Sequence, residues 1–284
     1  MKPLVSIALA VYNGASTLDI AVRSVLEQSF QEWELIILDD GSTDGSLTVM
    51  GSFDDPRIRL VEGKENLGLS ARLNMAADMA KGIYFARMDQ DDICHPDRIE
   101  KQVEFLQMHP AVDLLATATI VIRDEGEILG RRSVSSEHKD ICAQPWNGFH
   151  LPHPTWMGRI DWFRLHRYDS SANGAEDNQL LLRTYRTSQF ACLARPLLAY
   201  REGTRSLKKM MKTRRIFARV YLREFARSRR YDMLFLVIFL SLLKVIADVL
   251  NLKFGVASMR NRLLPLSEED LLNWRQVWSD LNLK

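Results

Sequence analysis

The sequence predicts an α/β protein: a mostly parallel central sheet with helices on both faces, followed by a helical C-terminal extension. In the first third of the chain, short apolar runs alternate with segments of helical periodicity, which is the rhythm of parallel strands joined by helices. The runs are nearly all apolar, as in strands that are covered on both faces. Polar or acidic residues follow three of them, at the strand ends where such sheets bind ligands.

Four strands and three helices are expected in this first part. The strands share apolar runs bounded by turn residues, and cover residues 5–11, 33–40, 57–63 and 83–88. The helices share apolar residues at three- and four-residue spacing, and begin near Ser16 or Thr17, near Ser42 or Thr43, and at Leu69. Asn13-Gly14 ends the first strand and Gly82 ends the third helix.

The elements that follow have weaker signals. Pro96 opens a helix that ends near His109, and residues 111–122 and 127–132 predict a strand pair that turns at Gly126. The remaining segments are a proline-rich loop, two helices and two short strands, at residues 150–158, 161–166, 175–186, 190–194 and 197–201.

The composition is that of an ordinary globular protein. With 284 residues, 46% of them hydrophobic, the chain can bury a substantial core. Its three cysteines are odd in number and include no CxxC pair, so neither a disulfide framework nor a zinc site is indicated, and a reducing cytoplasm is expected. Tyr12 and Asn13 follow the N-terminal apolar run where a signal peptide would have small residues. We therefore predict a first strand there.

Two acidic clusters follow predicted strands. Asp39 and Asp40 open DDGSTDGS, and Asp89, Asp91 and Asp92 lie in RMDQDD. Close carboxylates raise one another's pKa unless a cation or polar ligand offsets the repulsion. Two carboxylates that flank one residue of a turn can hold a divalent cation, and Mg²⁺ or Mn²⁺ suits such hard oxygen ligands together with substrate phosphates.

Each acidic group also has a purely structural interpretation. DDGSTDGS is equally well explained by a turn and helix cap or by a contact to a nucleotide base or ribose. For Asp92 we favour a cap on the helix that follows Pro96. Glu176 and Asp177 either interact with a helix dipole or include a general base for an attacking hydroxyl. The local sequence leaves that choice open.

Several common chemistries are disfavoured. His150 and His153 have no HExxH-type context, so a loop shaped by prolines is preferred to metal ligation there. Walker A, GxSxG and GxGxxG patterns are absent from the sequence. This removes the usual phosphate-loop and serine-hydrolase interpretations.

Eight segments, taken in order, resemble the nucleotide-diphospho-sugar glycosyltransferases of family 2, which have the GT-A fold. They are VSIALAVYNG, LEQSFQEWELIILDDGSTDGS, NLGLSARLNMA, GIYFARMDQDD, PDRIEKQVEFL, HPTWMGR, AEDNQLLLR and PLLAYR. Together they cover residues 3–206. Each segment alone is a weak signal, but their shared order and ordinary spacing make the resemblance specific.

The resemblance implies a nucleotide sugar, commonly a UDP-sugar, lying across the strand ends. The residues it places there are Ala10, Tyr12, Asp39, Asp40, Asn66, Gly68, Arg72, Asp89 and Asp91. Among them, Asp40 is favoured for the base contact and Asp89 lies nearer the ribose. Asp91 is the favoured ligand of a Mn²⁺ or Mg²⁺ ion that bridges the diphosphate, with Asp89 as the second metal residue.

The resemblance also implies a single displacement that inverts the anomeric centre. Asp177 would deprotonate the acceptor hydroxyl as it attacks the sugar, with Glu176 assisting. The cation and Arg72 would stabilise the leaving diphosphate. In HPTWMGR, His153 and Trp156 would line the acceptor side.

The chain departs from the family pattern at two places. Many relatives have a His after the last strand in a YRxH pattern, whereas this chain has YREGTRS. Many also have Thr or Ser at the position of Ala10, so one contact to the base is lost. Two other functions compete. One is a catalytically silent nucleotide-sugar binding or assembly protein; the other is a nucleotidyltransferase, whose Gly-rich, Arg-bearing loop is absent after Val11.

The C-terminal third has a different charge. Residues 205–230 contain eleven Lys or Arg and the single acid Glu224, a net charge of +10, whereas the remainder carries −8. Apolar residues at helical spacing, Met210, Phe217, Tyr221 and Phe225, predict a basic amphipathic helix here. Residues 233–243 are uncharged but too few to span a bilayer. We favour an interfacial helical hairpin over two helices packed on the core.

These observations define the expected organisation. Residues 1–206 form the glycosyltransferase domain, and residues 207–284 form a basic, helical extension. Arg205–Arg230 is expected to bind an anionic membrane surface, at roughly 1 kcal/mol per basic residue, and no nucleic acid. The expected location is cytoplasmic, on the inner face of the cell membrane, with a glycan or polyprenol-linked acceptor.

Overall fold

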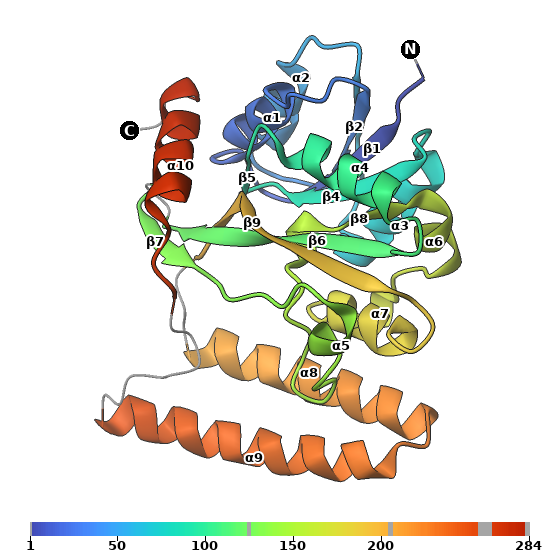
Figure 1. Ribbon diagram of the computed structural model, residues 1–284, viewed down its shortest axis with the longest axis vertical. Helices are drawn as coiled ribbons and strands as arrows, with labels where there is room; N and C mark the ends of the chain where they lie inside the picture. The colour runs from blue at the N-terminus through green and yellow to red at the C-terminus, as the bar shows by residue number, and fades with distance from the viewer. Residues whose placement is uncertain (1, 124–125, 204–206, 255–262, 282–284) are drawn as a thin grey trace.

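The computed structural model describes residues 2–123, 126–203, 207–254 and 263–281, and the side chains of these residues outside 207–210 and 244–254. Arg205 and the predicted domain boundary at residue 206 lie outside the described residues. Figure 1 shows a sheet with helices on both of its faces and two long helices along one side of the molecule.

The first half of the sheet is parallel, as predicted. Its strands are β1 (Val5–Val11), β2 (Trp33–Asp39), β3 (Ile58–Val61) and β4 (Tyr84–Asp89), in the order β3-β2-β1-β4. The intervening helices are α1 (Leu18–Leu26), α2 (Ser46–Gly51) and α3 (Leu69–Met79). Alternate residues of β1 enter different apolar clusters: Ile7 packs with α1, and Ala8 packs with α3. The strands are therefore covered on both faces.

Beyond β4 the sheet is mixed rather than parallel. The additional strands are β5 (Ile93–Cys94), β6 (Leu114–Ile122), β7 (Ile128–Arg131), β8 (Met157–Arg159) and β9 (Phe190–Arg201). β8 pairs antiparallel with β4 and β6, whereas β6 pairs parallel with β9. The loop predicted over residues 150–158 is wrong at its end, where β8 begins. The two short strands predicted near the end of the domain are one strand, β9, with register shifts near Pro196.

The other helices are α4 (Arg98–Met108), α5 (His138–Ile141), α6 (Ile160–Leu165), α7 (Glu176–Thr184), α8 (Leu207–Arg227), α9 (Tyr231–Phe254) and α10 (Glu268–Asp280), with 3₁₀ turns η1 (His153–Thr155) and η2 (Ser170–Ala172). Of these helices, α4, α6, α7, α8 and α9 follow the predicted order, whereas α5 and α10 were not predicted. Within the described parts of the chain, no helix has the length and hydropathy needed to cross a membrane.

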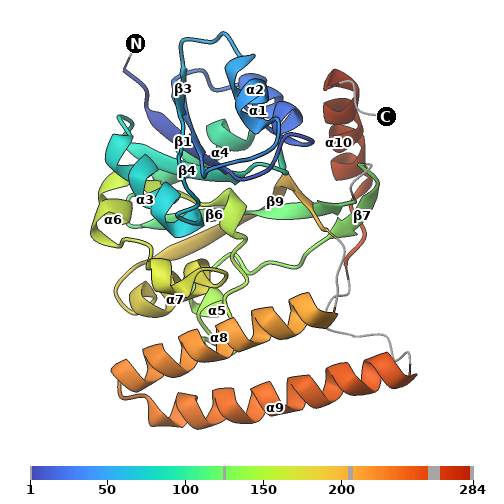
Figure 2. The ribbon, with the colours of Figure 1, turned by 180° about the vertical axis from the view of Figure 1, so that it is seen from behind.

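α8 and α9 form an antiparallel hairpin in which α9 is outermost (Figures 1 and 2). Val220, Tyr221 and Phe225 of α8 are buried in the apolar cluster that also contains Leu180 and Leu181 of α7. The apolar stripe predicted for the basic segment therefore packs on the core. The stripe members Phe217, Tyr221 and Phe225 are packed in the fold, which contradicts the expectation that these side chains lie in a membrane interface. The side chain of Met210 lies outside the described residues.

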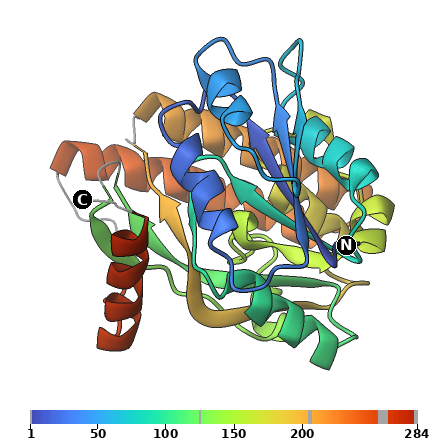
Figure 3. The same cartoon turned by 90° about the horizontal axis from the view of Figure 1, so that it is seen from above.

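α10 returns to the sheet and stands beside β7 (Figure 3). Its Trp274 is buried against Ile93, Ile120 and Ala199, and its indole N–H donates to the carbonyl of Pro196 at 3.2 Å. The part of the extension that contains α10 thus completes the apolar core beside the sheet.

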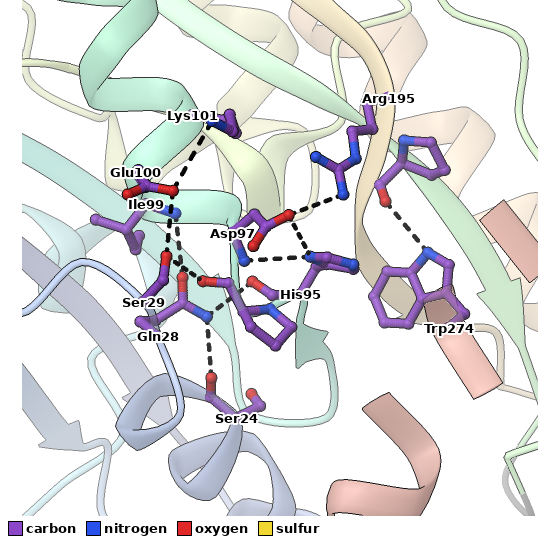
Figure 4. Close-up of polar contacts among 12 residues, drawn as sticks. Ser24, Gln28, Ser29, His95, Asp97, Ile99, Glu100, Lys101, Arg195 and Trp274 are labelled. Atoms are coloured by element: carbon purple, nitrogen blue, oxygen red, sulfur yellow. Dashed lines mark hydrogen bonds and ion pairs between the residues drawn. The ribbon is translucent and has the colours of Figure 1, made fainter. Parts of the chain in front are cut away.

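A polar network fixes the chain just after the second acidic cluster (Figure 4). Gln28, just after α1, donates from Nε2 to the carbonyl of Ser24 in α1 at 3.0 Å and to that of His95 at 2.8 Å, and accepts the N–H of Ile99 at 3.1 Å. His95 Nδ1 accepts the N–H of Asp97 at 3.2 Å, and Asp97 forms an ion pair with Arg195 at 2.8 Å. The start of α4 is therefore attached to both α1 and β9.

Candidate functional site

The three strand ends that the sequence predicted to converge lie side by side. Val11 of β1 is in register with Asp39 of β2, and Ala10 of β1 is in register with Asp89 of β4. Gln90 joins two of these ends: its Oε1 accepts the N–H of Tyr12 at 2.7 Å, and its Nε2 donates to the Tyr12 carbonyl at 3.1 Å. The Tyr12 ring is left half exposed at this edge.

The Asp39–Asp40 cluster is bonded to its own chain. Asp40 accepts the N–H groups of Leu67 and Gly68 at 2.8 and 2.9 Å, and its Oδ1 accepts Arg72 Nε at 2.7 Å. Asp39 accepts the N–H of Gly41 at 3.0 Å and that of Ser42 at 3.2 Å. These acids hold the turn after β2 and the loop before α3. The Asp40 carboxylate accepts three hydrogen bonds from the protein itself.

Arg72 is buried rather than turned toward a diphosphate. It is 3% exposed, and besides Asp40 it donates to the carbonyl of Glu65 at 2.8 Å. In this structure the guanidinium holds the loop, and the predicted phosphate role of Arg72 stays a prediction. In that loop Asn66 is exposed, and Gly68 has φ +84 with Asn173 close beside it. A side chain at Gly68 would be strained and would meet Asn173.

The Asp89–Asp92 cluster has a different environment. Arg87 is fully buried and pairs with Asp89, with one N–O distance of 3.0 Å. Burial, and then the charge of Asp89, raise the pKa of Asp91. Asp92 is 1% exposed; its Oδ1 accepts the N–H of Arg201 at 3.1 Å, while its Oδ2 has no hydrogen-bond partner. Burial, Asp89 and Asp91 raise the pKa of Asp92 well above its usual range.

The predicted helix cap at Asp92 is wrong, because Asp97 occupies the cap position of α4 and Asp92 binds β9 instead. The cluster as a whole fits a divalent cation. Asp89 and Asp91 offer hard oxygen ligands, and burial together with the charge of Asp89 disfavours the ionised form of Asp91, whose pKa is raised, so a nearby cation would be favourable there. In the described residues no three His, Cys, Asp or Glu side chains gather as a complete metal cage. Substrate oxygens would have to supply the rest.

A cavity of about 870 Å³ connects this cluster with the N-terminus of α7. Its lining includes Asp89, His153, Glu176 and Asp177. Burial raises the pKa of both α7 acids, and the neighbouring Asp177 raises that of Glu176 further. Two acids predicted for chemistry thus share one cavity with an acid predicted for metal and donor binding.

The two residues predicted for the acceptor side have different positions. His153 lines the cavity and lies 2.9 Å from the Tyr168 hydroxyl through Nε2. Burial and then the charge of Arg87 lower the pKa of His153 well below its usual range, so its imidazole is neutral. Trp156 is fully buried, packs edge-on against His153 at 4.5 Å and donates to the Leu151 carbonyl. The predicted acceptor contact of Trp156 is therefore wrong; it supports His153 from beneath.

Sequence reasoning missed the residues that hold the α7 acids. Asp177 accepts a hydrogen bond from Asn178 Nδ2 at 3.0 Å, and Asn178 Oδ1 accepts the Tyr221 hydroxyl at 2.8 Å. Tyr221 comes from α8, far along the chain, so no local pattern connects it to α7. Arg87 was visible beside the acids in RMDQDD, but its burial was not.

Known proteins are similar to this chain in sequence. The profile of "Glycosyl transferase family 2" matches residues 6–166, more than half of the chain. EpsE of Bacillus subtilis (strain 168), a glycosyltransferase by name, is 40% identical over 190 residues, which are 64% of this chain and 67% of EpsE. TuaG of the same organism, named as a glycosyltransferase of teichuronic acid biosynthesis, is 42% identical over 107 residues, covering 37% of this chain and 42% of TuaG.

The fold is also found in a solved structure. S. aureus TarS 1–349 in complex with UDP-GlcNAc superposes with a TM-score of 0.61 at 17% identity, over 98% of this chain and 80% of that chain. The match therefore includes the C-terminal helices as well as the sheet. This chain spans from about two fifths to two thirds of the length of the two B. subtilis relatives.

Proposed function

Because the chain belongs to glycosyl transferase family 2, we propose that it moves a sugar from a nucleoside diphosphate sugar, with UDP as the nucleotide, to a hydroxyl of a saccharide or lipid-linked acceptor. The reaction would serve cell-surface polysaccharide synthesis, which the name of TuaG supports. UDP is supported by the TarS complexes with UDP and UDP-GlcNAc. The observation that carries the proposal is the shared cavity of Asp89 and Asp177.

Asp177 is proposed as the general base. It takes the proton of the acceptor hydroxyl while that oxygen forms a bond to the anomeric carbon and the bond from this carbon to the diphosphate breaks. Attack from the face opposite the leaving group inverts the anomeric centre. The raised pKa of Asp177 makes its carboxylate a stronger base than an exposed one. Glu176 lies beside it, with its carboxylate accepting the N–H of Gly174, and assists in orienting the acceptor.

The donor is proposed to lie over the strand ends, with its base near Tyr12 and the Asp39–Asp40 turn. Asp91, with Asp89, would hold a Mn²⁺ or Mg²⁺ ion. When bound, such an ion stabilises the negative charge of the diphosphate as a Lewis acid. The protein's own contribution is positional: Gln90 ties the turn of the acids to Tyr12, and Arg87 fixes the Asp89 carboxylate from below.

The acceptor is proposed to enter beside His153. The neutral imidazole and the Tyr168 hydroxyl form a polar contact in the wall, and Phe149, Leu151 and Phe217 supply apolar surface. A lipid-linked saccharide presents both kinds of surface, and its use would place the protein on the inner face of the cell membrane.

The test separates donor binding from turnover. Purified protein is offered UDP-sugars with Mn²⁺; binding is followed by thermal shift, because a ligand of the folded state raises the melting temperature, and turnover by UDP release with a membrane glycolipid extract. Asp177→Asn should keep the thermal shift and lower turnover by about 10²- to 10⁴-fold. Asp91→Asn should lose the Mn²⁺-dependent part of the shift.

Asp161→Asn serves as the control, because this α6 carboxylate is 76% exposed and remote from the cavity lining. It should match the wild type in both assays. Full turnover by Asp177→Asn would remove that residue from the mechanism. A donor-dependent shift without turnover, whatever the acceptor extract, would instead favour a silent nucleotide-sugar binding protein.

A further inference from the structure

The outer face of α9 is apolar and exposed. Its exposed large side chains recur at three- and four-residue spacing, which places them on one face of the helix. They are Tyr231, Phe235, Ile238, Phe239, Leu242 and Leu243, with exposed fractions of 60%, 71%, 41%, 59%, 60% and 45%. We call this set the α9 stripe.

The α9 stripe is not the face that holds the helix in the fold. Met233, Leu234 and Val237 pack into the main apolar cluster, together with Leu222 of α8. The helix is therefore apolar on two sides, and only one is covered. In the described residues every other helix exposes at most one large apolar side chain, such as Met108 of α4, Leu165 of α6 and Leu272 of α10. Single exposed residues are ordinary, whereas a continuous patch marks a binding surface.

The positive charge of the neighbouring helix α8 and of the α8–α9 turn indicates which partner the α9 stripe binds. α8, which lies along α9 (Figures 1 and 2), carries exposed Lys212, Arg215 and Arg219, and the turn between the helices adds exposed Arg229. A second copy of the chain would bring an equally basic surface against these residues, and like charges across an interface are unfavourable. An anionic lipid surface satisfies both features, since aromatic and aliphatic side chains enter the interface while Arg and Lys meet headgroups.

We propose that the α9 stripe docks on an anionic lipid surface, with α9 lying in the plane of the interface. The α9 stripe, and not the α8 residues Tyr221 and Phe225 that are buried in the core, is then the surface that contacts lipid. It also gives the hairpin a connection to the cavity, because α8 contributes Tyr221 to Asn178 beside Asp177 and Phe217 to the cavity wall. The docking does not depend on which sugar is transferred.

The experiment is flotation of the full chain with vesicles of phosphatidylcholine alone and with added phosphatidylglycerol. The wild type should float with the anionic vesicles and be released by high salt. Phe235→Glu combined with Phe239→Glu should lower the partition coefficient by about tenfold or more. Leu165→Glu replaces an equally exposed apolar residue of α6 and should leave binding unchanged.

Because both phenylalanines are exposed, the double variant should keep the wild-type melting temperature and its donor-dependent thermal shift. Failure of the wild type to float, or wild-type flotation of the double variant, overturns the proposal. So does a concentration-dependent dimer in sedimentation that the double variant abolishes, since the stripe would then bind a second copy. All these readouts leave the proposed sugar transfer standing, which is measured separately by UDP release.

Discussion

The two acidic clusters occupy equivalent places, each at the end of a parallel strand next to β1, yet their carboxylates are used differently. Around Asp39 and Asp40, backbone N–H groups and the buried Arg72 take up the oxygens. In the Asp89–Asp92 cluster, Asp92 has a buried oxygen without a partner, and Asp91 and Asp92 have raised pKa values. The first cluster shapes the backbone, whereas in the second Asp89 pairs with Arg87 and burial disfavours the ionised forms of Asp91 and Asp92.

The second cluster depends on its surroundings for rigidity. Arg87 fixes Asp89, the N–H of Arg201 fixes Asp92, and the network around His95 and Gln28 holds the chain that follows. Several other elements thus hold the backbone on which the carboxylates of this cluster lie. This difference leads to three predictions.

The largest expected effect is on the first cluster. Asp40→Ala removes the partner of a buried guanidinium and the acceptor of two N–H groups. Because an unpaired buried charge is strongly unfavourable, the free energy of unfolding should fall by about 3 to 5 kcal/mol. Urea denaturation at pH 7 measures it.

Asp78→Ala is the matched control. Asp78 also pairs with an arginine, Arg167, but its side chain is 58% exposed, so the loss should be only about 0 to 1 kcal/mol. Equal losses in the two variants would mean that Asp40 is not the structural centre that its contacts indicate, and the contrast between the clusters would disappear.

The second prediction concerns the support of the Asp89–Asp92 cluster. Burial lowers the pKa of His95 from 6.5 to about 4, with Asp97 and Asp270 opposing the shift and Arg195 adding to it. A depressed histidine pKa gives stability that is fully present above pH 6.5 and is lost as the pH falls toward 4. By pH 4 the free energy of unfolding should have dropped by about 3 kcal/mol from this group alone.

His95→Asn separates this contribution from other acid effects. The Asn side chain can still accept the N–H of Asp97, as His95 Nδ1 does, but it does not titrate. Urea denaturation of both proteins at pH 7 and pH 4 should show a smaller acid loss in the variant. The same loss in both would assign the acid sensitivity elsewhere.

Much of the fold followed from the sequence because it is encoded locally. The apolar runs of β1, β2 and β4 and the periodicity of α1 and α3 are local patterns, and they predicted the parallel half of the sheet correctly. β8 escaped prediction because only three residues pair, with β4 and β6 on either side. The stripe of α8 was assigned to a membrane because an amphipathic helix has the same pattern whether lipid or protein covers it.

The site shows the same limit. That Asp39 and Asp89 would meet at one sheet edge follows from strand parallelism alone. Whether an arginine meets a ligand or a neighbouring carboxylate is decided by tertiary contacts, so the pairing of Arg72 with Asp40 could not be predicted from the sequence. Trp156 was assigned to the acceptor for the same reason, since its sequence neighbour His153 does line the cavity.

The smallest predicted effect is that an Asp→Asn substitution changes the free energy of unfolding in opposite directions in the two clusters. Asp92→Asn replaces a carboxyl whose ionised form is disfavoured by burial, Asp89 and Asp91, so the metal-free protein should gain about 1 kcal/mol of stability at pH 7. Asp39→Asn replaces one acceptor oxygen by an NH₂ group that would face backbone N–H donors. The free energy of unfolding should therefore fall by about 1 kcal/mol or more. Urea denaturation with EDTA gives both values.

The pH dependence makes this comparison stricter. A carboxyl whose pKa is raised by folding disfavours the folded state above that pKa, and the penalty shrinks as the pH falls from the folded-state pKa toward the ordinary value of 3.8, because the folded protein takes up the proton first. The gain from Asp92→Asn should therefore shrink on acidification, as the wild-type Asp92 becomes neutral too. A gain that is constant with pH would come from packing rather than charge. The carboxylates of the second cluster would then not be the uncompensated group that a cation is proposed to meet.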